Sequence, residues 1–130
     1  MKTQNVKRVL IVEDEEPLQE MYTEVFKRQG YEIDAAENGR IGFRKGVTFD
    51  YDIIICDLHM PEWHGLDAIK GILLVKPHCR FIVVSAYTDR RIANELRSID
   101  NVLELFSKPV DMNELISCIE SSKPEADAYY

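Results

Sequence analysis

Five short aliphatic runs recur along the 130-residue chain, and each is followed by a stretch whose apolar side chains have helical spacing. Parallel strands need a crossover segment between them, and that segment is usually an α-helix. The third run is almost entirely aliphatic, which is typical of a strand buried on both faces. We therefore predict a single α/β domain with a doubly wound, five-stranded parallel sheet. The predicted strands are 7–12, 31–36, 52–56, 81–84 and 102–106, and the predicted helices are 17–30, 41–47, 66–75 and two that begin near Asp89 and Asp111.

The composition is that of an ordinary globular protein, with 45% hydrophobic and 30% charged residues. The net charge is −7, so we expect no direct binding to nucleic acid or to an anionic membrane, because both require a basic surface. No apolar run approaches a membrane span, which needs about 18 residues. The N-terminus also lacks the apolar segment of a signal peptide, so the expected location is the cytoplasm.

Polar residues stand where four of the five predicted strands end. Glu13 and Asp14 follow the first strand, Asp57 the third, Ser85 the fourth and Lys108 the fifth. The carboxyl ends of parallel strands meet at one edge of the sheet, which is where open α/β sheets bind their ligands. The sequence therefore predicts one pocket that holds three carboxylates, a hydroxyl and an ammonium group.

The charges of this pocket predict a divalent cation. Three carboxylates a few ångströms apart repel one another by several kcal/mol, even at an effective dielectric constant of about 20. A Mg²⁺ ion and Lys108 together supply three positive charges and so balance them. Mg²⁺ binds oxygen ligands and keeps several of its waters. Asp14 and Asp57 are the expected ligands, with Mn²⁺ as the alternative ion.

Such a pocket has the groups needed for phosphoryl transfer. A carboxylate beside Mg²⁺ and a lysine can attack a phosphoryl group and form an acyl phosphate. The cations neutralise the transferring oxygens, and a hydroxyl and a backbone amide can hold another. Ser85 and the amide of Ala86 are placed for this role. Attraction of Ser85 to the new phosphoryl group is expected to move the following loop and the helix that begins near Asp89.

The chain resembles the receiver domains of two-component response regulators over about residues 7–120. The resemblance implies the flavodoxin-like (βα)5 receiver fold for residues 1–120. Residues 121–130 have no periodic pattern, so we expect them to form a flexible tail or the start of a linker. The pattern appears in order along the chain: Glu13 with Asp14, then Asp57 followed by Met60, Pro61 and Gly65, then Ser85 with Ala86, and finally Lys108 with Pro109.

By this resemblance Asp57 accepts a phosphoryl group from a histidine kinase, a histidine phosphotransfer protein or a small donor such as acetyl phosphate. Glu13, through a water, and the backbone carbonyl of His59 are implied to complete the Mg²⁺ shell. The Lys108–Pro109 bond is expected to be cis. The domain is expected to catalyse only its own phosphorylation and dephosphorylation, and so not to be an enzyme in the usual sense.

Phosphorylation is then expected to switch the surface around the two helices that begin near Asp89 and Asp111. The output partner is unknown, and either a monomer or a phosphorylation-dependent dimer is compatible with the sequence. The alternatives are a receiver fragment of a larger regulator or hybrid histidine kinase, and a flavodoxin-like cofactor binder. The second is disfavoured because the acidic loop 13–16 would repel a flavin phosphate. An aspartate-nucleophile phosphatase is also disfavoured, since His59 stands where that class has its acid.

Two positions depart from the receiver pattern. Receivers usually carry Tyr or Phe three residues before the lysine, but here Leu105 occupies that position and Phe106 follows it. Because side chains alternate along a strand, Phe106 is predicted to face the opposite side, and we expect signalling without an aromatic switch unless a bulge restores Phe106 to that face. The second departure is Tyr87 paired with His59, beside the path of the hydrolytic water. This pair suggests a long-lived phosphoryl state.

Overall fold

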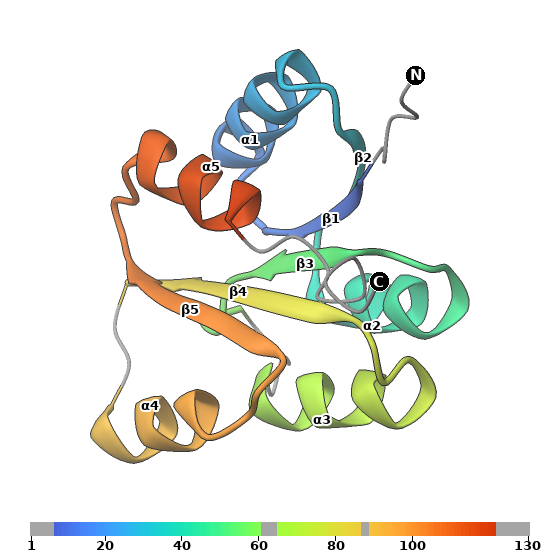
Figure 1. Ribbon diagram of the computed structural model, residues 1–130, viewed down its shortest axis with the longest axis vertical. Helices are drawn as coiled ribbons and strands as arrows, with labels where there is room; N and C mark the ends of the chain where they lie inside the picture. The colour runs from blue at the N-terminus through green and yellow to red at the C-terminus, as the bar shows by residue number, and fades with distance from the viewer. Residues whose placement is uncertain (1–6, 61–64, 87–88, 122–130) are drawn as a thin grey trace, which may run out of the picture.

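Strands and helices alternate strictly in the computed structural model, which describes residues 7–60, 65–86 and 89–121 (Figure 1). The strands pair in parallel in the order β2-β1-β3-β4-β5, as predicted for a doubly wound sheet. Within these described ranges no helix is both long and apolar enough to span a membrane. The elements are β1 (Arg8–Val12), α1 (Glu16–Arg28), β2 (Glu32–Ala36), α2 (Gly39–Thr48), β3 (Ile53–Cys56), α3 (Gly65–Val75), β4 (Arg80–Ser85), α4 (Arg90–Arg97), β5 (Val102–Ser107) and α5 (Met112–Glu120).

Helices cover both faces of the sheet (Figure 1). Helices α1 and α5 lie on one face, whereas α2, α3 and α4 lie on the other. Each layer has its own apolar core: Tyr22 and Phe26 belong to the first, and Ile69 and Leu96 belong to the second. All four residues of β3 are buried, which explains why this central strand is a continuous aliphatic run.

Helix α2 is longer than the predicted 41–47, because it begins at Gly39 after an N-cap. The side chain of Asn38 accepts a hydrogen bond of 2.8 Å from the amide of Ile41. The glycines of α2 permit close packing. A Cβ atom on Gly42 would lie 2.7 Å from Val12 Cγ1, and one on Gly46 would lie 2.7 Å from Ile72 Cδ1. Helix α2 can therefore approach the sheet and α3 only without these side chains.

The final two helices begin at the predicted aspartates. The carboxylate of Asp89 accepts a hydrogen bond of 2.9 Å from the amide of Ile92, and Asp111 accepts one of 2.8 Å from the amide of Asn113. Each side chain satisfies a backbone donor that the first helical turn leaves unpaired. These caps fix where α4 and α5 leave the carboxyl edge of the sheet.

A β-bulge changes the facing of residues along β5. Phe81 pairs with Val102, but Ile82 pairs with Glu104, so Leu103 is an extra residue in the ladder. After the bulge Leu105 packs with the core under α2, α3 and α4, while Phe106 packs with the core under α1 and α5. The bulge lies before Leu105, so it does not bring Phe106 to the face that Leu105 occupies.

Candidate functional site at the carboxyl edge of the sheet

The strand order places the predicted acidic residues together. Strands β1 and β3 are neighbours, with Val12 paired to Cys56, so the residues that follow them lie side by side. Oxygen atoms of Glu13, Asp14 and Asp57 all lie within 4.8 Å of one another. Glu13 and Asp57 are buried, whereas Asp14 is exposed. The predicted pocket of three carboxylates is therefore present, with one side open to solvent.

Lys108 reaches this cluster from the end of β5. Its Nζ lies 2.8 Å from Asp57 Oδ2 and 3.3 Å from Glu13 Oε1. Its backbone amide donates a hydrogen bond of 2.9 Å to the carbonyl of Ser85, which ties the ends of β4 and β5 together. The Lys108–Pro109 peptide bond is cis, as the family resemblance implied. One ammonium group thus contacts two buried carboxylates.

Both carboxylate oxygens of Asp57 are held in place. Oδ1 accepts a hydrogen bond of 2.8 Å from the amide of His59, and Oδ2 receives the ammonium of Lys108. The backbone amide of Asp57 itself donates to the carbonyl of Val12 at 3.3 Å. A carboxylate with one fixed partner on each of its oxygens has a defined orientation, which is what an in-line nucleophile requires.

Glu13 is almost completely buried, and burial raises the pKa of its carboxyl group above the ordinary value of 4.5. The amide of Glu15 donates to Glu13 Oε2 at 3.1 Å, and Lys108 also favours the charged form, but these interactions do not offset burial. Burial lowers the pKa of Lys108, and the hydrogen bond and charge of Asp57 more than reverse this, giving about 12. The ammonium therefore stays charged at neutral pH.

The donor set of the cluster fits a hard divalent cation. The three carboxylates carry three formal negative charges, whereas Lys108 supplies one positive charge. All the side-chain ligands are oxygens, and Asp14 opens the cluster to solvent, so waters can complete a shell. A cation of charge +2 would bring the sum of these formal charges to zero.

The other predicted residues lie around this cluster. Ser85 is buried at the end of β4, and Ala86 is exposed beside it. His59 is exposed and contributes its amide to Asp57. Tyr87 and residues 61–64 lie outside the described ranges, so the predicted effect of Tyr87 on the water path stays a prediction.

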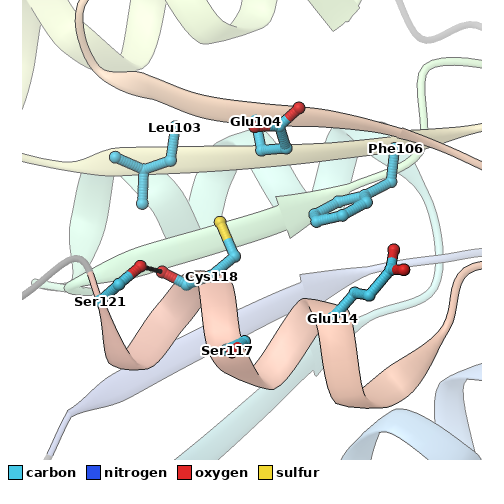
Figure 2. A pocket seen from close by; sticks show the side chains of 7 residues that line it. All are labelled: Leu103, Glu104, Phe106, Glu114, Ser117, Cys118 and Ser121. Carbon is cyan, nitrogen blue, oxygen red and sulfur yellow. Dashed lines mark hydrogen bonds between the residues drawn. The ribbon is translucent and has the colours of Figure 1, made fainter.

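Phe106 points away from the layer that contains α4. Its ring lies in a groove between β5 and α5, where the sulfur of Cys118 also points (Figure 2). Leu105, on the opposite face, occupies the position in which receivers usually carry an aromatic side chain. The alternation argument for these two residues is therefore confirmed. The groove is lined by Leu103, Glu104, Phe106, Glu114, Ser117, Cys118 and Ser121.

Sequence reasoning missed one polar atom near the site, the hydroxyl of Tyr22 on α1. Helical spacing marks Tyr22 only as a core residue, and it is indeed 2% exposed. Its hydroxyl has no hydrogen-bond partner among the described residues. Burial raises the pKa of Tyr22 to about 12, and the nearby charges of Glu13 and Asp57 add to this effect. No sequence pattern reports such a hydroxyl, because it depends on how α1 packs.

Comparison with known families agrees with this geometry. The model of the response regulator receiver domain matches residues 9–120. The chain belongs to the response regulator receiver family. The resemblance drawn from the residues is thereby confirmed, and so is the predicted fold class.

Receiver relatives differ in how much of their length this chain spans. It is 41% identical over 81 residues to the chemotaxis protein CheY of Thermotoga maritima, covering 62% of this chain and 68% of that protein. It is 25% identical over 117 residues to the sporulation initiation phosphotransferase F of Bacillus subtilis, covering 90% and 94%. It is 30% identical over 110 residues to the regulatory protein AtoC of Escherichia coli, covering 85% of this chain but only 24% of AtoC.

Solved receiver structures share the fold. The response regulator TrrA of Thermotoga maritima, solved in complex with Mg(2+)-BeF, has a TM-score of 0.77 at 32% identity and covers 89% of this chain and 98% of its own. A CheY-like receiver domain protein from Methanospirillum hungatei has a TM-score of 0.84 at 20% identity and covers 90% and 93%. The second comparison supports the fold alone.

Proposed function

We propose that this receiver domain accepts a phosphoryl group on Asp57 and so acts as the switch of a phosphorelay. The observation that carries the proposal is the buried carboxylate of Asp57, which Lys108 and the His59 amide hold between them beside two further carboxylates. The donor is a histidine kinase, a histidine phosphotransfer protein or a small acyl phosphate. The relative TrrA, solved in complex with Mg(2+)-BeF, supports a metal-assisted reaction.

Asp14, Asp57 and the backbone carbonyl of His59 are the proposed direct ligands of Mg²⁺ or Mn²⁺, with Glu13 acting through a water. When bound, the ion neutralises charge on the transferring phosphoryl oxygens. A carboxylate oxygen of Asp57 attacks phosphorus and forms an O–P bond, while the bond from phosphorus to the donor nitrogen or oxygen breaks. The electron pair of that bond leaves with the donor. Lys108, Ser85 and the amide of Ala86 hold the phosphoryl oxygens in this account.

The product changes the contacts that Lys108 and Ser85 make. Lys108 contacts Asp57 and Glu13 before the reaction. A phosphoryl group on Asp57 carries more negative charge, so it draws the ammonium and the Ser85 hydroxyl toward itself. Ser85 leads through the following loop into α4, whose N-cap is Asp89, and Lys108 leads to α5, whose N-cap is Asp111. We propose that these two helix starts form the switched surface.

The switch is proposed to work without a rotating ring at position 105. Leu105 has only aliphatic atoms to repack against the α4 layer, and Phe106 already packs against α5. The domain is further proposed to catalyse only its own phosphorylation and dephosphorylation. Tyr87 beside His59 is proposed to slow hydrolysis of the acyl phosphate. A measured dephosphorylation half-life of seconds would contradict that last point.

The kinase and the output partner are proposed only by class. A histidine kinase or phosphotransfer protein supplies the phosphoryl group, and an output protein or domain reads the switched surface. Because the net charge is −7, the partner is proposed to be protein and not nucleic acid or membrane. The cytoplasm is the proposed location, since both ATP-dependent kinases and Mg²⁺ are found there.

The test is intact mass spectrometry after incubation with acetyl phosphate and Mg²⁺. The expected result is a gain of one phosphoryl group that needs Mg²⁺ and is lost in Asp57→Asn. A matched control is Asp67→Asn, which removes an exposed carboxylate on α3 and should leave the gain unchanged. A gain that persists in Asp57→Asn, or no gain in folded protein saturated with Mg²⁺, would contradict the proposal.

A further inference from the structure

An exposed apolar patch lies on the outer surface of α2 and α3, away from the two helix starts proposed as the switched surface. Leu74 is 87% exposed, Val75 is 55% exposed and Phe43 is 38% exposed. Single exposed apolar residues are common on soluble proteins, but adjoining ones mark interaction sites more often. The first question is therefore whether these three side chains adjoin one another.

Helix packing shows that they form one surface. A Cβ atom on Gly71 would lie 2.9 Å from Phe43 Cε1, so the ring of Phe43 lies directly over Gly71. Leu74 and Val75 are three and four residues beyond Gly71, and residues at these spacings are neighbours on a helix. Helices α2 and α3 lie side by side on one face of the sheet (Figure 1). The glycine lets the ring of one helix meet the exposed end of the other.

Unpaired cations border this patch on α2. Arg40 and Arg44 are both exposed and stand three residues before and one residue after Phe43. Neither forms an ion pair within the described ranges of the chain. The lysines of the same region are paired, with Lys45 bound to Asp34, Lys70 to Glu95 and Lys76 to Asp50. Asp67 is the only carboxylate on α3, so this apolar surface has a net positive border in a chain of net charge −7.

We propose that the α2–α3 patch docks an amphipathic helix of a protein partner, with apolar residues against Phe43, Leu74 and Val75 and carboxylates opposite Arg40 and Arg44. A third helix can lie along two adjacent parallel helices and bury this surface. A symmetric contact with a second copy is disfavoured, because it would bring the guanidinium groups of both copies together. The partner therefore carries negative charge beside its apolar face.

Docking here is independent of phosphorylation. Helices α2 and α3 carry none of the residues that contact Asp57, and they are not the helices that begin at Asp89 and Asp111. The patch should therefore bind equally well in the wild type and in Asp57→Asn. This separates the inference from the proposed function, because either one can fail while the other holds.

The test is titration of the isotopically labelled protein with a designed amphipathic helical peptide of about 18 residues, which gives about five turns. One face of the peptide carries Leu and the other Glu, and a second peptide carries Lys in place of Glu. Amide shifts are expected to cluster at Phe43, Gly71 and Leu74 with the Glu peptide. The Lys peptide is expected to bind about tenfold more weakly, and added salt should narrow the difference.

Variants identify the surface that the peptide contacts. Leu74→Asp is expected to lower the affinity for the Glu peptide by about tenfold, because it removes a central apolar anchor. The double variant Arg40→Glu with Arg44→Glu should remove the preference for the Glu peptide. Met21→Asp is the matched control, since Met21 is an exposed apolar residue on α1, outside the patch, and it should change nothing.

Several results would overturn the inference. These are shifts that map elsewhere, equal or tighter binding of the Lys peptide, and an unchanged affinity in Leu74→Asp. Sedimentation that shows a dimer of the free protein abolished by Leu74→Asp would assign the patch to a second copy instead. Binding of the protein to anionic vesicles, lost in the Arg40→Glu and Arg44→Glu variant, would assign it to a lipid surface.

Discussion

Asp34 and Asp57 each accept a hydrogen bond of 2.8 Å from a lysine ammonium, yet their surroundings differ. Asp34, on β2, also accepts one from the Tyr51 hydroxyl at 2.6 Å and one from the Ala35 amide at 2.9 Å. Burial alone would raise the pKa of Asp34, but the hydrogen bonds from Lys45 and Tyr51 lower it below 3.8. At the carboxyl edge, by contrast, Lys108 is shared by two buried carboxylates.

The difference is one of charge balance. Asp34 has its own lysine and three hydrogen bonds, so that cluster stabilises the fold as it stands. The site has three carboxylates and one lysine, and the pKa of Glu13 is raised because its charge is incompletely compensated in a buried place. Functional sites commonly hold groups that the folded protein alone does not satisfy. A bound divalent cation would balance the formal charges of the site.

The largest predicted effect is that of removing the shared lysine. Lys108→Met leaves Glu13 and Asp57 buried without their ammonium and should lower the free energy of unfolding by about 3 kcal/mol. Lys45→Met leaves Asp34 with its hydrogen bonds from Tyr51 and a backbone amide, and the Lys45–Asp34 pair is more exposed than the Lys108 pairs. This substitution should therefore lower the free energy of unfolding by only about 1 kcal/mol. Urea unfolding without Mg²⁺ measures both. A larger loss for Lys45→Met would break the comparison.

Neutralising one carboxylate in each cluster should have opposite effects on stability. Asp34→Asn removes a satisfied charge and should lower the free energy of unfolding by about 1.5 kcal/mol. Asp14→Asn removes one of three repelling charges and should raise it slightly in the absence of Mg²⁺. The measurement is the urea midpoint of each variant in chelator. The account fails here if both variants shift the midpoint in the same direction.

The pH dependence should separate the same two clusters. Because the folded-state pKa of Asp34 is lowered, its stabilisation is present above pH 3.8 and is lost as the pH falls through the folded-state value. The folded-state pKa of Glu13 is raised, so folding favours its protonated form. The stability that this form contributes is present below pH 4.5 and is lost as the pH rises through the folded-state value. Relative to the wild type, Glu13→Gln should therefore be more stable at neutral pH, and Asp34→Asn less stable.

Stability curves of these two variants from acid to neutral pH, in chelator, provide the check. The advantage of Glu13→Gln should vanish below pH 4.5, and the deficit of Asp34→Asn should shrink below pH 3.8. A Glu13→Gln protein that is less stable than the wild type at neutral pH would show that Lys108 fully compensates the Glu13 charge.

Two buried tyrosines extend the comparison with small predicted effects. Tyr51→Phe removes the hydroxyl bound to Asp34 and should cost about 1 kcal/mol. Tyr22→Phe removes a buried hydroxyl that has no partner within the described residues, so the change should be between zero and a gain of about 1 kcal/mol. Calorimetric melting of both variants measures this. A clear loss in Tyr22→Phe would mean that its hydroxyl is bound, for example by a water.

Sequence reasoning located the site because the site depends on strand ends. An aspartate directly after the aliphatic strand β3 and a lysine directly after β5 lie at the carboxyl edge whatever the details of packing. The facing of Phe106 relative to Leu105 likewise follows from alternation within a strand. These predictions needed only the order and direction of the elements.

Features that depend on contacts between elements could not be predicted. The cluster of Asp34, Lys45 and Tyr51 joins β2, α2 and the segment before β3, which come together only in the folded protein. The role of Gly42 follows from its distance to Val12, not from its helix propensity. The bulge at Leu103 could not be predicted, because it is defined by the register between β4 and β5 and not by the sequence of β5 alone.

The most direct test of the charge account is the melting temperature with and without Mg²⁺, measured for the wild type, Asp14→Asn, Asp57→Asn and Asp34→Asn. A cation that binds the folded state alone raises the melting temperature. The account predicts a clear rise for the wild type, little or none for Asp14→Asn and Asp57→Asn, and a full rise from a lower starting point for Asp34→Asn. An equal rise in Asp57→Asn and the wild type would contradict it.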